Sequence, residues 1–363
     1  MKYLAYISIG FVAFQFFNVL LNFFFRQKIK KNNLASNEKI SVLIPARNEE
    51  QNIHLLLGDL QKMKNENLEI IVYDDQSTDN TAQIVQEFAE VDPRIKLMQS
   101  KGLPDGWLGK NHACYQLAQE AKGNYFLFID ADVRLKGNII EEAISHLNIH
   151  NLGLLSVFPT QIQKTWGEKV SVPIMNYILL TLLPLIFVRI SPFASHAAAN
   201  GQFMLFNAHT YQKKQPHQTF KSSAVEDIAI SRFFKKEKIK IACITGEKRI
   251  KCRMYSSYNE AKNGFTKNVF MFFGNQAVLA FLFWIFATLG FIPILLAKAT
   301  LLPIYFALVI LIQVIYSITS KQNVELNLLF FPLQLLFLGQ LLIKAVLTKK
   351  NKQYKWKGRD VFL

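Results

Sequence analysis

Short apolar runs alternate with longer mixed stretches between residues 39 and 160. The runs at 39–45, 68–73, 94–99, 125–129 and 152–159 have the length and the aliphatic or aromatic bias of buried strands. Helices are expected between the first four runs, ending near residues 64, 90 and 121. Strands that alternate with helices predict βαβ units and a mostly parallel sheet. Such sheets bind their ligands at the carboxyl ends of the strands, so polar residues at those ends are the first candidates for a site.

Later elements extend this domain. They are a strand at 200–207, a helix at 222–236 and a pair of strands at 239–245 and 248–254. Two helix starts have hydroxyl residues suited to capping. Ser77 or Thr78 is the expected N-cap of the helix that ends near residue 90, and Ser222 or Ser223 that of the helix at 222–236.

Uncharged apolar stretches at both ends predict contact with a membrane. Residues 3–25 carry no charge and are followed by Arg26, Lys28, Lys30 and Lys31. This length spans a bilayer, and the positive-inside rule places its basic end in the cytoplasm. A signal peptide is the rival interpretation, but the apolar run is too long and no small-residue cleavage site follows it.

The C-terminal third holds three further apolar stretches, at 277–297, 299–320 and 326–343. Three crossings from the cytoplasm would leave the basic tail outside, against the positive-inside rule. Either one stretch is therefore not a simple span, or residues 170–188 also cross. We expect 170–188 to lie at the interface or to pack against membrane helices, because a crossing would separate later site candidates from Asp132.

These patterns divide the chain into five parts. They are an N-terminal transmembrane anchor (1–31), an α/β domain (39–255), an interfacial amphipathic helix (256–275), a C-terminal transmembrane region (276–348) and a basic cytoplasmic tail (349–363).

Composition supports a membrane protein of a reducing compartment. The chain is 51% hydrophobic with 31 Phe, and its net charge of +16 comes from lysines that cluster beside apolar runs. No signature of a nucleic-acid-binding domain is present. The three cysteines are scattered and lack C-x-x-C spacing, so no disulfide framework is expected.

The strand at 125–129 ends in Asp130-Ala131-Asp132, which places two carboxylates on one side of an extended chain. Mg²⁺ or Mn²⁺ typically takes one or two carboxylates together with substrate phosphates, so a site for a divalent metal and a diphosphate is one hypothesis. A polar turn in which Asp132 helps to cap the next helix is the other. Arg47 and Asp75 follow two further strands and favour the first hypothesis, because all three strand ends fall on one edge of the sheet.

Four motifs in order resemble the family-two glycosyltransferases of GT-A fold. They are S-V-L-I-P-A-R-N-E-E, I-V-Y-D-D-Q-S-T-D-N-T, F-I-D-A-D and V-E-D. A wider set is similar to the membrane glycosyltransferases of carotenoid glycoside synthesis, of the 4,4'-diaponeurosporenoate glycosyltransferase type, and to the hopene-associated glycosyltransferases. That set is W-L-G-K-N-H-A-C-Y-Q, N-G-Q-F, R-M-Y, G-F-T-K-N and W-K-G-R-D.

The resemblance implies an α/β domain of GT-A type, Rossmann-like with a mostly parallel sheet, facing the cytoplasm between one N-terminal and two to three C-terminal transmembrane helices. It assigns roles residue by residue. Nucleotide-sugar binding falls to Pro45, Ala46, Arg47, Glu49, Asp75 and Asp130, metal binding to Asp132 with Asp130, and catalysis to Asp227 as base with Glu226 beside it. The Q-x-x-R-W motif of processive synthases is missing, which favours a single transfer.

Other candidates come from the chemistry alone, each with a plainer alternative. Lys110 at a helix start offers a cation for a leaving diphosphate, or it is a surface lysine. Asn200, Gly201 and Gln202 face the acceptor, or they satisfy a loop. Trp107 stacks on a sugar or packs in its loop. Three histidines are more typical of packed polar residues than of ligands or bases, namely His112, His196 and His209.

The sequence therefore predicts a multi-pass enzyme of the cell's inner membrane that uses Mg²⁺ or Mn²⁺. It would move one sugar, with inversion, from a nucleotide-diphosphate sugar to a lipid acceptor such as a carotenoid or another isoprenoid, without contact with nucleic acid. Two alternatives stay open. One is a polyprenyl-phosphate glycosyltransferase, whose ionised acceptor would make Asp227 dispensable. The other is a non-catalytic membrane scaffold with a nucleotide-binding fold.

Overall fold

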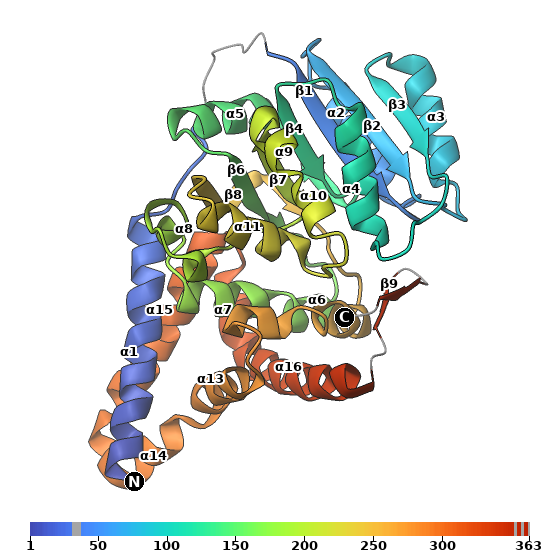
Figure 1. Ribbon diagram of the computed structural model, residues 1–363. Helices are drawn as coiled ribbons and strands as arrows, with labels where there is room; N and C mark the ends of the chain where they lie inside the picture. The colour runs from blue at the N-terminus through green and yellow to red at the C-terminus, as the bar shows by residue number, and fades with distance from the viewer. Residues whose placement is uncertain (31–37, 352–353, 357–358, 362–363) are drawn as a thin grey trace.

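A computed structural model describes residues 1–30, 38–351, 354–356 and 359–361, and it places an α/β domain on a group of apolar helices (Figure 1). The predicted anchor residue Lys31 and parts of the predicted tail lie outside the described residues. The domain is built on an eight-stranded sheet of order β3-β2-β1-β4-β7-β6-β8-β5. Its strands are β1 Ile40–Ala46, β2 Leu68–Asp74, β3 Ile95–Gln99, β4 Tyr125–Ile129, β5 Val133–Leu135, β6 Leu154–Gln161, β7 Phe203–Asn207 and β8 Ile241–Cys252. A separate pair is formed by β9 Tyr354–Trp356 and β10 Arg359–Val361.

The first half of the sheet is parallel, as the alternating pattern predicts. β1 pairs with β2 and with β4, and β2 pairs with β3, all in parallel. The connecting helices are α2 Ile53–Gln61, α3 Thr81–Val91 and α4 Gly109–Glu120. All residues of β2 and β4 are buried, including Glu69 and Asp74 of β2, and β4 is an unbroken apolar run. The carboxyl ends of β1, β2 and β4 therefore share one edge of the sheet.

The second half of the sheet is mixed, with both parallel and antiparallel pairs. β7 runs antiparallel to both β4 and β6, β6 and β8 are parallel, and β5 is antiparallel to β8. Period-two patterns do not distinguish strand direction, and only the pairing does. The reversal has a functional consequence, since Phe203 at the start of β7 pairs with Ile129 at the end of β4. Residues 200–202 thereby lie beside the D-x-D.

The predicted strand pair at 239–245 and 248–254 is one strand instead. β8 continues from Ile241 to Cys252 and pairs along β6 with a register shift. Gly246, with φ +75°, absorbs the irregularity as a bulge residue does, so the chain does not turn back.

Both capping predictions were wrong. α3 begins after Asn80 and α11 (Glu226–Lys236) after Val225, neither with a side-chain cap. The hydroxyl of Ser77 is used elsewhere, because it accepts the backbone N–H of Asn48 in the neighbouring loop at 2.9 Å.

The remaining helices cover the second half of the sheet and form the apolar part. They are α1 Lys2–Phe24, α5 Ile139–Ile149, α6 Trp166–Ser171, α7 Pro173–Leu182, α8 Ile186–Ile190, α9 Ala208–Lys214, α10 Pro216–Thr219, α12 Tyr258–Phe265, α13 Ala277–Leu289, α14 Phe291–Lys298, α15 Leu302–Ser320 and α16 Val324–Asn351, with 3-10 turns at Ala194–His196, Val269–Phe273 and Ala299–Leu301.

Two stretches that were each expected to form a single helix are divided into shorter elements in the structure. The stretch 170–188 forms parts of α6, α7 and α8, and α7 packs against α1, α15 and α16, as one of the two expectations had it. The stretch 256–275 is not one amphipathic helix but the short α12 followed by a 3-10 turn.

Three apolar helices among the described residues are long enough to cross a membrane: Lys2–Phe24, Phe291–Ser320 and Val324–Thr348. α1 and α15 run in the same direction along each other. Lys298, just before α15, lies over the ring of Tyr6 near the start of α1, whereas Arg26 after α1 reaches the carbonyl of Thr319 at the end of α15. The chain must therefore return to the N-terminal end of α1 before α15 begins, and Figure 1 shows α14 beside that end of α1.

The last long helix, α16, stays against the α/β domain along its length. Asn327 donates to Ser317 at the domain end of α15, Gln334 to the carbonyl of Lys169 after the start of α6, and Gln340 accepts from Tyr258 of α12. Pro332 lies inside this helix. In Figure 1 α16 lies across the base of the domain rather than alongside α1.

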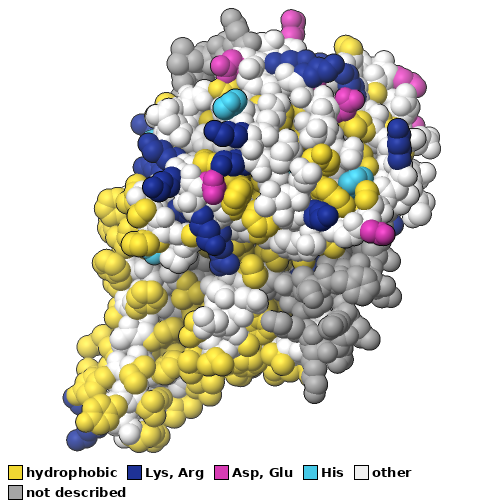
Figure 2. Space-filling model, in the orientation of Figure 1, with side chains coloured by type: hydrophobic (Ala, Val, Ile, Leu, Met, Phe, Trp, Pro, Cys, Tyr) yellow, Lys and Arg dark blue, Asp and Glu magenta, His cyan; other side chains and the backbone are white. Residues whose placement is uncertain are grey.

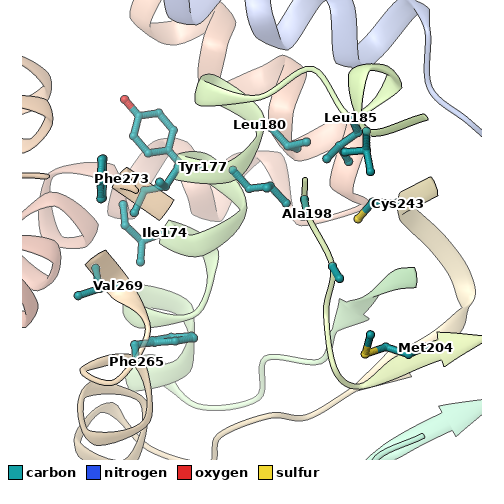
Figure 3. Close-up of a cluster of buried hydrophobic side chains, with 14 of the residues drawn as sticks. Ile174, Tyr177, Leu180, Leu185, Ala198, Met204, Cys243, Phe265, Val269 and Phe273 are labelled. Carbon is teal, nitrogen blue, oxygen red and sulfur yellow. The ribbon is translucent and has the colours of Figure 1, made fainter. Parts of the chain in front are cut away.

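One hydrophobic core joins the domain to the apolar helices. It runs without a break from Phe126 of β4 through Tyr177 of α7 to Val12 of α1. Figure 3 shows the middle of this core, where Met204 and Cys243 of the sheet face the same interior as Leu180 of α7. The domain is thus packed on the apolar helices, not tethered to them.

A polar stripe on α1 fixes this junction. Gln15, Asn18 and Asn22 are buried and share one helix face. Gln15 donates to the hydroxyl of Tyr177 at 3.1 Å and Asn18 to the carbonyl of Thr181 at 2.8 Å. Asn22 donates to the carbonyls of Leu180 and Leu183 and accepts the N–H of Leu185 at 2.7 Å.

We expect Asn22→Leu to destabilise the protein by about 2–4 kcal/mol, because each buried backbone group left without a partner costs about 1–3 kcal/mol. Thermal unfolding in detergent measures this, with the exposed Phe17→Leu on the same helix as the control, for which little change is expected. Equal unfolding temperatures for the two variants would contradict the role of the stripe.

Candidate active site

The ends of β1 and β2 form one connected surface. Arg47, just after β1, donates to the carbonyl of Asp75 at 2.5 Å, and the N–H of Asp75 donates to the carbonyl of Ala46 at 2.8 Å. The N–H groups of Glu49 and Glu50 donate to Thr81 and Asp79 of the second loop. The structure therefore brings the candidates from two separate motifs, Pro45 to Glu49 and Asp75, to the same edge.

The D-x-D residues lie at the same edge, at the end of β4. Asp132 is half-buried, and its Oδ1 is enclosed without a hydrogen-bond partner. Burial, with the nearby charges of Asp130 and Glu49, raises the pKa of Asp132 to about 7. Its other oxygen faces the amide of Gln202 at 3.5 Å, a long contact. A carboxylate oxygen without a hydrogen-bond partner is able to bind a cation.

Lys110 at the start of α4 joins the two carboxylate motifs. Its Nζ lies 2.7 Å from Asp130 Oδ1 and 3.6 Å from Glu226 Oε1. Burial alone would lower the pKa of this ammonium, but the two carboxylates raise it well above the usual value. Lys110 is partly exposed, and its ammonium lies between the carboxylates of Asp130 and Glu226.

Asp227 is the second residue of α11 and lies beside this cation. Its Oδ2 accepts the N–H of Gly201 at 2.9 Å, and its Oδ1 accepts the N–H of Ile228 at 2.7 Å. Burial and the neighbouring Glu226 raise the pKa of Asp227 to about 7. A carboxyl group with this pKa exchanges protons near neutral pH.

Residues 200–202 are held in hydrogen bonds around these carboxylates, and they do not form an exposed surface. Asn200 is held by Ser156 through its backbone, and its side-chain oxygen accepts the N–H of Gln202 at 2.8 Å. Gln202 is buried, and its amide donates to Cys252 Sγ at 2.7 Å. Gly201 has no side chain to crowd Lys110 and Glu226. A Cβ at this position would stand 3.2 Å from Lys110 Nζ and 3.3 Å from Glu226 Oε1.

We expect the series Gly201→Ala and Gly201→Val to lower kcat progressively, reaching about 100-fold for valine, because a displacement of about 1 Å in a reacting group can cost that much. Gly58→Ala is the matched control, since a Cβ at Gly58 meets nothing within 4 Å. Steady-state rates measure the effect. Undiminished turnover by Gly201→Val would show that Lys110 and Glu226 need not keep their positions.

Asn111 is a positioning residue that sequence reasoning missed. It is buried in α4, and its amide donates to the carbonyls of Phe220, Lys221 and Ser223. These bonds hold the loop that leads to Glu226 and Asp227 against the helix that carries Lys110. The only signal was its place after Lys110 in the W-L-G-K-N-H motif.

Other candidates serve packing. Trp107 contacts the rings of His112 and Tyr115, and burial lowers the pKa of His112. His196 stacks on Phe187 and approaches the hydroxyl of Ser191, and its carbonyl accepts from Lys235 near the C-terminal end of α11. The structure does not bring His196 to the edge where Asp132 lies.

The residues present fit a divalent metal. The described part of the chain contains no group of three or more His, Cys, Asp or Glu that could hold a metal alone. Mg²⁺ does not need one, since it usually binds one or two carboxylates plus substrate phosphates. The enclosed, unpartnered Oδ1 of Asp132 meets this requirement, with Asp130 close by.

The region that carries these residues matches a known family. Residues 41–207 match the family model described as Glycosyl transferase family 2. This part of the chain is therefore similar to glycosyltransferase family 2. The prediction from the motifs is thereby confirmed, and the protein is an enzyme of the glycosyltransferase class.

Curated relatives of this glycosyltransferase carry one name. The 4,4'-diaponeurosporenoate glycosyltransferase of Staphylococcus aureus strain USA300 is 29% identical over 275 residues, covering 73% of this chain and 71% of that protein. The enzyme of that name from the bovine strain RF122 is 28% identical and covers 99% of this chain and 98% of the relative. Among solved structures, the mannosyltransferase PcManGT from Pyrobaculum calidifontis in complex with GDP-Man and Mn²⁺ superposes with a TM-score of 0.58. It is 16% identical and covers 95% of this chain and 98% of its own, and it shows the GT-A fold.

Proposed function

We propose that this glycosyltransferase moves one sugar from a nucleotide-diphosphate sugar to a lipid acceptor held by the membrane. The observation that carries the proposal is the meeting of Lys110, Asp130, Glu226 and Asp227 within one network beside Asp132. Two carboxylate motifs almost 100 positions apart and a shared cation have no structural need to converge. They suit a reaction that separates charge between a diphosphate and an acceptor oxygen.

The donor would lie along the edge formed by β1, β2 and β4. Pro45, Ala46, Arg47 and Glu49 border the place of the nucleotide, and Asp75 would bind its base or ribose. Lys110, fixed at 2.7 Å from Asp130, would stabilise the leaving diphosphate. A divalent metal on Asp132 and Asp130 would supply Lewis-acid stabilisation of the same charge. The PcManGT complex, which holds a nucleotide sugar and Mn²⁺, supports this assignment.

The acceptor would be activated by Asp227. Its Oδ2 is held by the N–H of Gly201, which orients a lone pair for an acceptor hydroxyl. A pKa of about 7 allows this group to remove a proton at neutral pH, a step worth roughly 10²–10⁴-fold. Direct attack of the acceptor oxygen on the anomeric carbon inverts its configuration. One such base, without a processive motif, supports a single transfer.

A lipid acceptor is supported by the core that joins the site to the membrane helices. The curated relatives are named for a diaponeurosporenoate acceptor, and we propose a carotenoid or another isoprenoid for this protein. If the acceptor oxygen is already ionised, as in the polyprenyl-phosphate alternative, Asp227 is not needed as a base. The two acceptor classes are therefore separable by one substitution, considered in the Discussion.

We also propose that the catalytic domain faces the cytoplasm from the inner membrane. α1, the α13–α14 pair and α15 would cross, and α16 would lie at the base of the domain, which leaves the basic tail on the cytoplasmic side. A fluorescent protein fused after Leu363 should then fluoresce in cells, and an alkaline phosphatase fusion should be inactive. The reverse pattern would make α16 a crossing helix.

The test of the function is donor turnover by the purified protein in detergent. A panel of nucleotide sugars is offered with Mg²⁺ or Mn²⁺ and a membrane lipid extract. We expect metal-dependent release of nucleoside diphosphate from one donor and a glycosylated product that extracts with lipid. Release that requires only water-soluble acceptors would refute the lipid acceptor, and no release with any donor would refute the proposed donor class.

A further inference from the structure

A basic cavity lies at the edge of the sheet, apart from the carboxylate network. It has a volume of about 510 Å³, within the usual range for a ligand site. Asp59 is the one carboxylate that lines it, against six cationic side chains: Lys62, Arg134, Lys136, Lys248, Arg249 and Lys251. A cavity with this lining suits an anion.

Only part of that charge is neutralised within the protein. Arg134 pairs with Asp59 at 2.6 Å, and Arg249 pairs with Glu142 and Glu247. The four lysines of the cavity have no ion-pair partner among the residues that the structure describes. The charges of the two arginines are thus paired within the protein, whereas the charges of the four lysines are available to a ligand.

The cavity reaches the level at which the apolar helices meet the domain. Lys248, at its border, is close enough to Lys321 at the end of α15 for the two charges to repel, and Arg26 and Lys28 after α1 join the same group. Gly246, two residues before Lys248, lies against the carbonyl of Thr319 in the last turn of α15. Figure 2 shows Lys and Arg side chains gathered on the flank where the wide domain meets the apolar extension.

We propose that this cavity binds the phosphate headgroup of an anionic membrane phospholipid, with Lys136, Lys248 and Lys251 as its main contacts. The acyl chains would follow the ends of α1 and α15 into the bilayer, where Arg26, Lys28 and Lys321 add to the attraction. A soluble phosphate offers the same charge but lacks the chains, so location at the membrane boundary favours the lipid.

The test uses the full-length protein in nanodiscs of phosphatidylcholine with or without phosphatidylglycerol. We expect phosphatidylglycerol to raise the unfolding temperature and to remain bound after extraction into detergent, as native mass spectrometry would show. The variant Lys136→Gln/Lys248→Gln/Lys251→Gln should bind it about 100-fold more weakly, at roughly fivefold per basic side chain near a membrane surface.

The matched control carries the same change at three exposed lysines that do not line the cavity, Lys96→Gln/Lys101→Gln/Lys213→Gln, and should keep the preference of the wild type. Equal phosphatidylglycerol binding by the two triple variants would overturn the site. Equal stabilisation of the wild type by 10 mM inorganic phosphate, a concentration chosen to be about saturating for a soluble anion, would overturn the lipid as its ligand.

Discussion

Asp132→Asn should reduce turnover by about 10³-fold or more while the protein stays folded. The substitution keeps the shape of the side chain and removes its charge. Lewis-acid stabilisation of a leaving diphosphate is worth several kcal/mol, and a neutral amide would not hold the cation that supplies it. Because burial opposes the charge of Asp132, replacing it should not lower the unfolding temperature of the metal-free protein.

Two measurements separate this expectation from a general loss of function. Mn²⁺ together with nucleoside diphosphate should raise the unfolding temperature of the wild type but not that of Asp132→Asn. Glu90→Gln, an equivalent change at an exposed position on α3, should behave as the wild type does. If Asp132→Asn retains both turnover and the response to Mn²⁺, the metal is held elsewhere or is not used.

Asp227→Asn should reduce turnover by about 10²–10⁴-fold with a hydroxyl acceptor, which is the usual worth of a general base. The asparagine can still accept the N–H of Gly201, so the loop around it should keep its geometry. Glu226→Gln tests the neighbour. We expect it to displace Lys110, whose Nζ lies 3.6 Å from Glu226, and so to act mainly on the departure of the diphosphate.

The pH dependence gives a second readout of the same group. Because the folded protein raises the pKa of Asp227 to about 7, the base form is the minority at pH 6 and the majority at pH 8. The wild-type rate should rise through this interval, and the remaining rate of Asp227→Asn should lack that rise. Full activity of Asp227→Asn, with no change of pH profile, would instead identify an acceptor whose oxygen is already ionised.

The same shift has a consequence for stability with a defined sign. An unfolded Asp titrates near pH 4, so the folded state binds a proton more tightly than the unfolded state does. Asp227 therefore favours the folded state at low pH and loses that contribution as the pH rises from about 4 through about 7. Asp227→Asn should remove this part of the pH dependence of unfolding.

The sequence predicted the parallel half of the sheet and the residues at its edge. Apolar runs and helix-length spacers determine β1 to β4, and parallel pairing then places Arg47, Asp75 and Asp132 together without further information. The same patterns do not specify the direction of β7, because strand polarity depends on pairing over long separations. The proximity of Gly201 to Asp227 was for that reason beyond local reasoning, although both motifs had been singled out.

The junction with the membrane was predicted least well. An uncharged stretch identifies a span, but it does not reveal that Gln15, Asn18 and Asn22 share a buried face. Nor does apolar length distinguish α16, which stays against the domain, from α15, which leaves it. Those differences reside in hydrogen bonds between segments about 80 to 170 positions apart, such as Tyr258 to Gln340 and Gln15 to Tyr177.

The continuous core has a bearing on which substrates the enzyme can select. In the proposed topology, the sheet shares its packing with α7 and α1, so the proposed catalytic edge is held at a constant height above the bilayer instead of moving on a flexible stalk. A lipid acceptor of the proposed kind must therefore extend its reactive end to that height while its tail remains in the lipid. The enzyme would then select acceptors by the distance between the bilayer and their reactive oxygen. In a series of acceptors that differ only in the length of the spacer before that oxygen, the rate should show a sharp optimum.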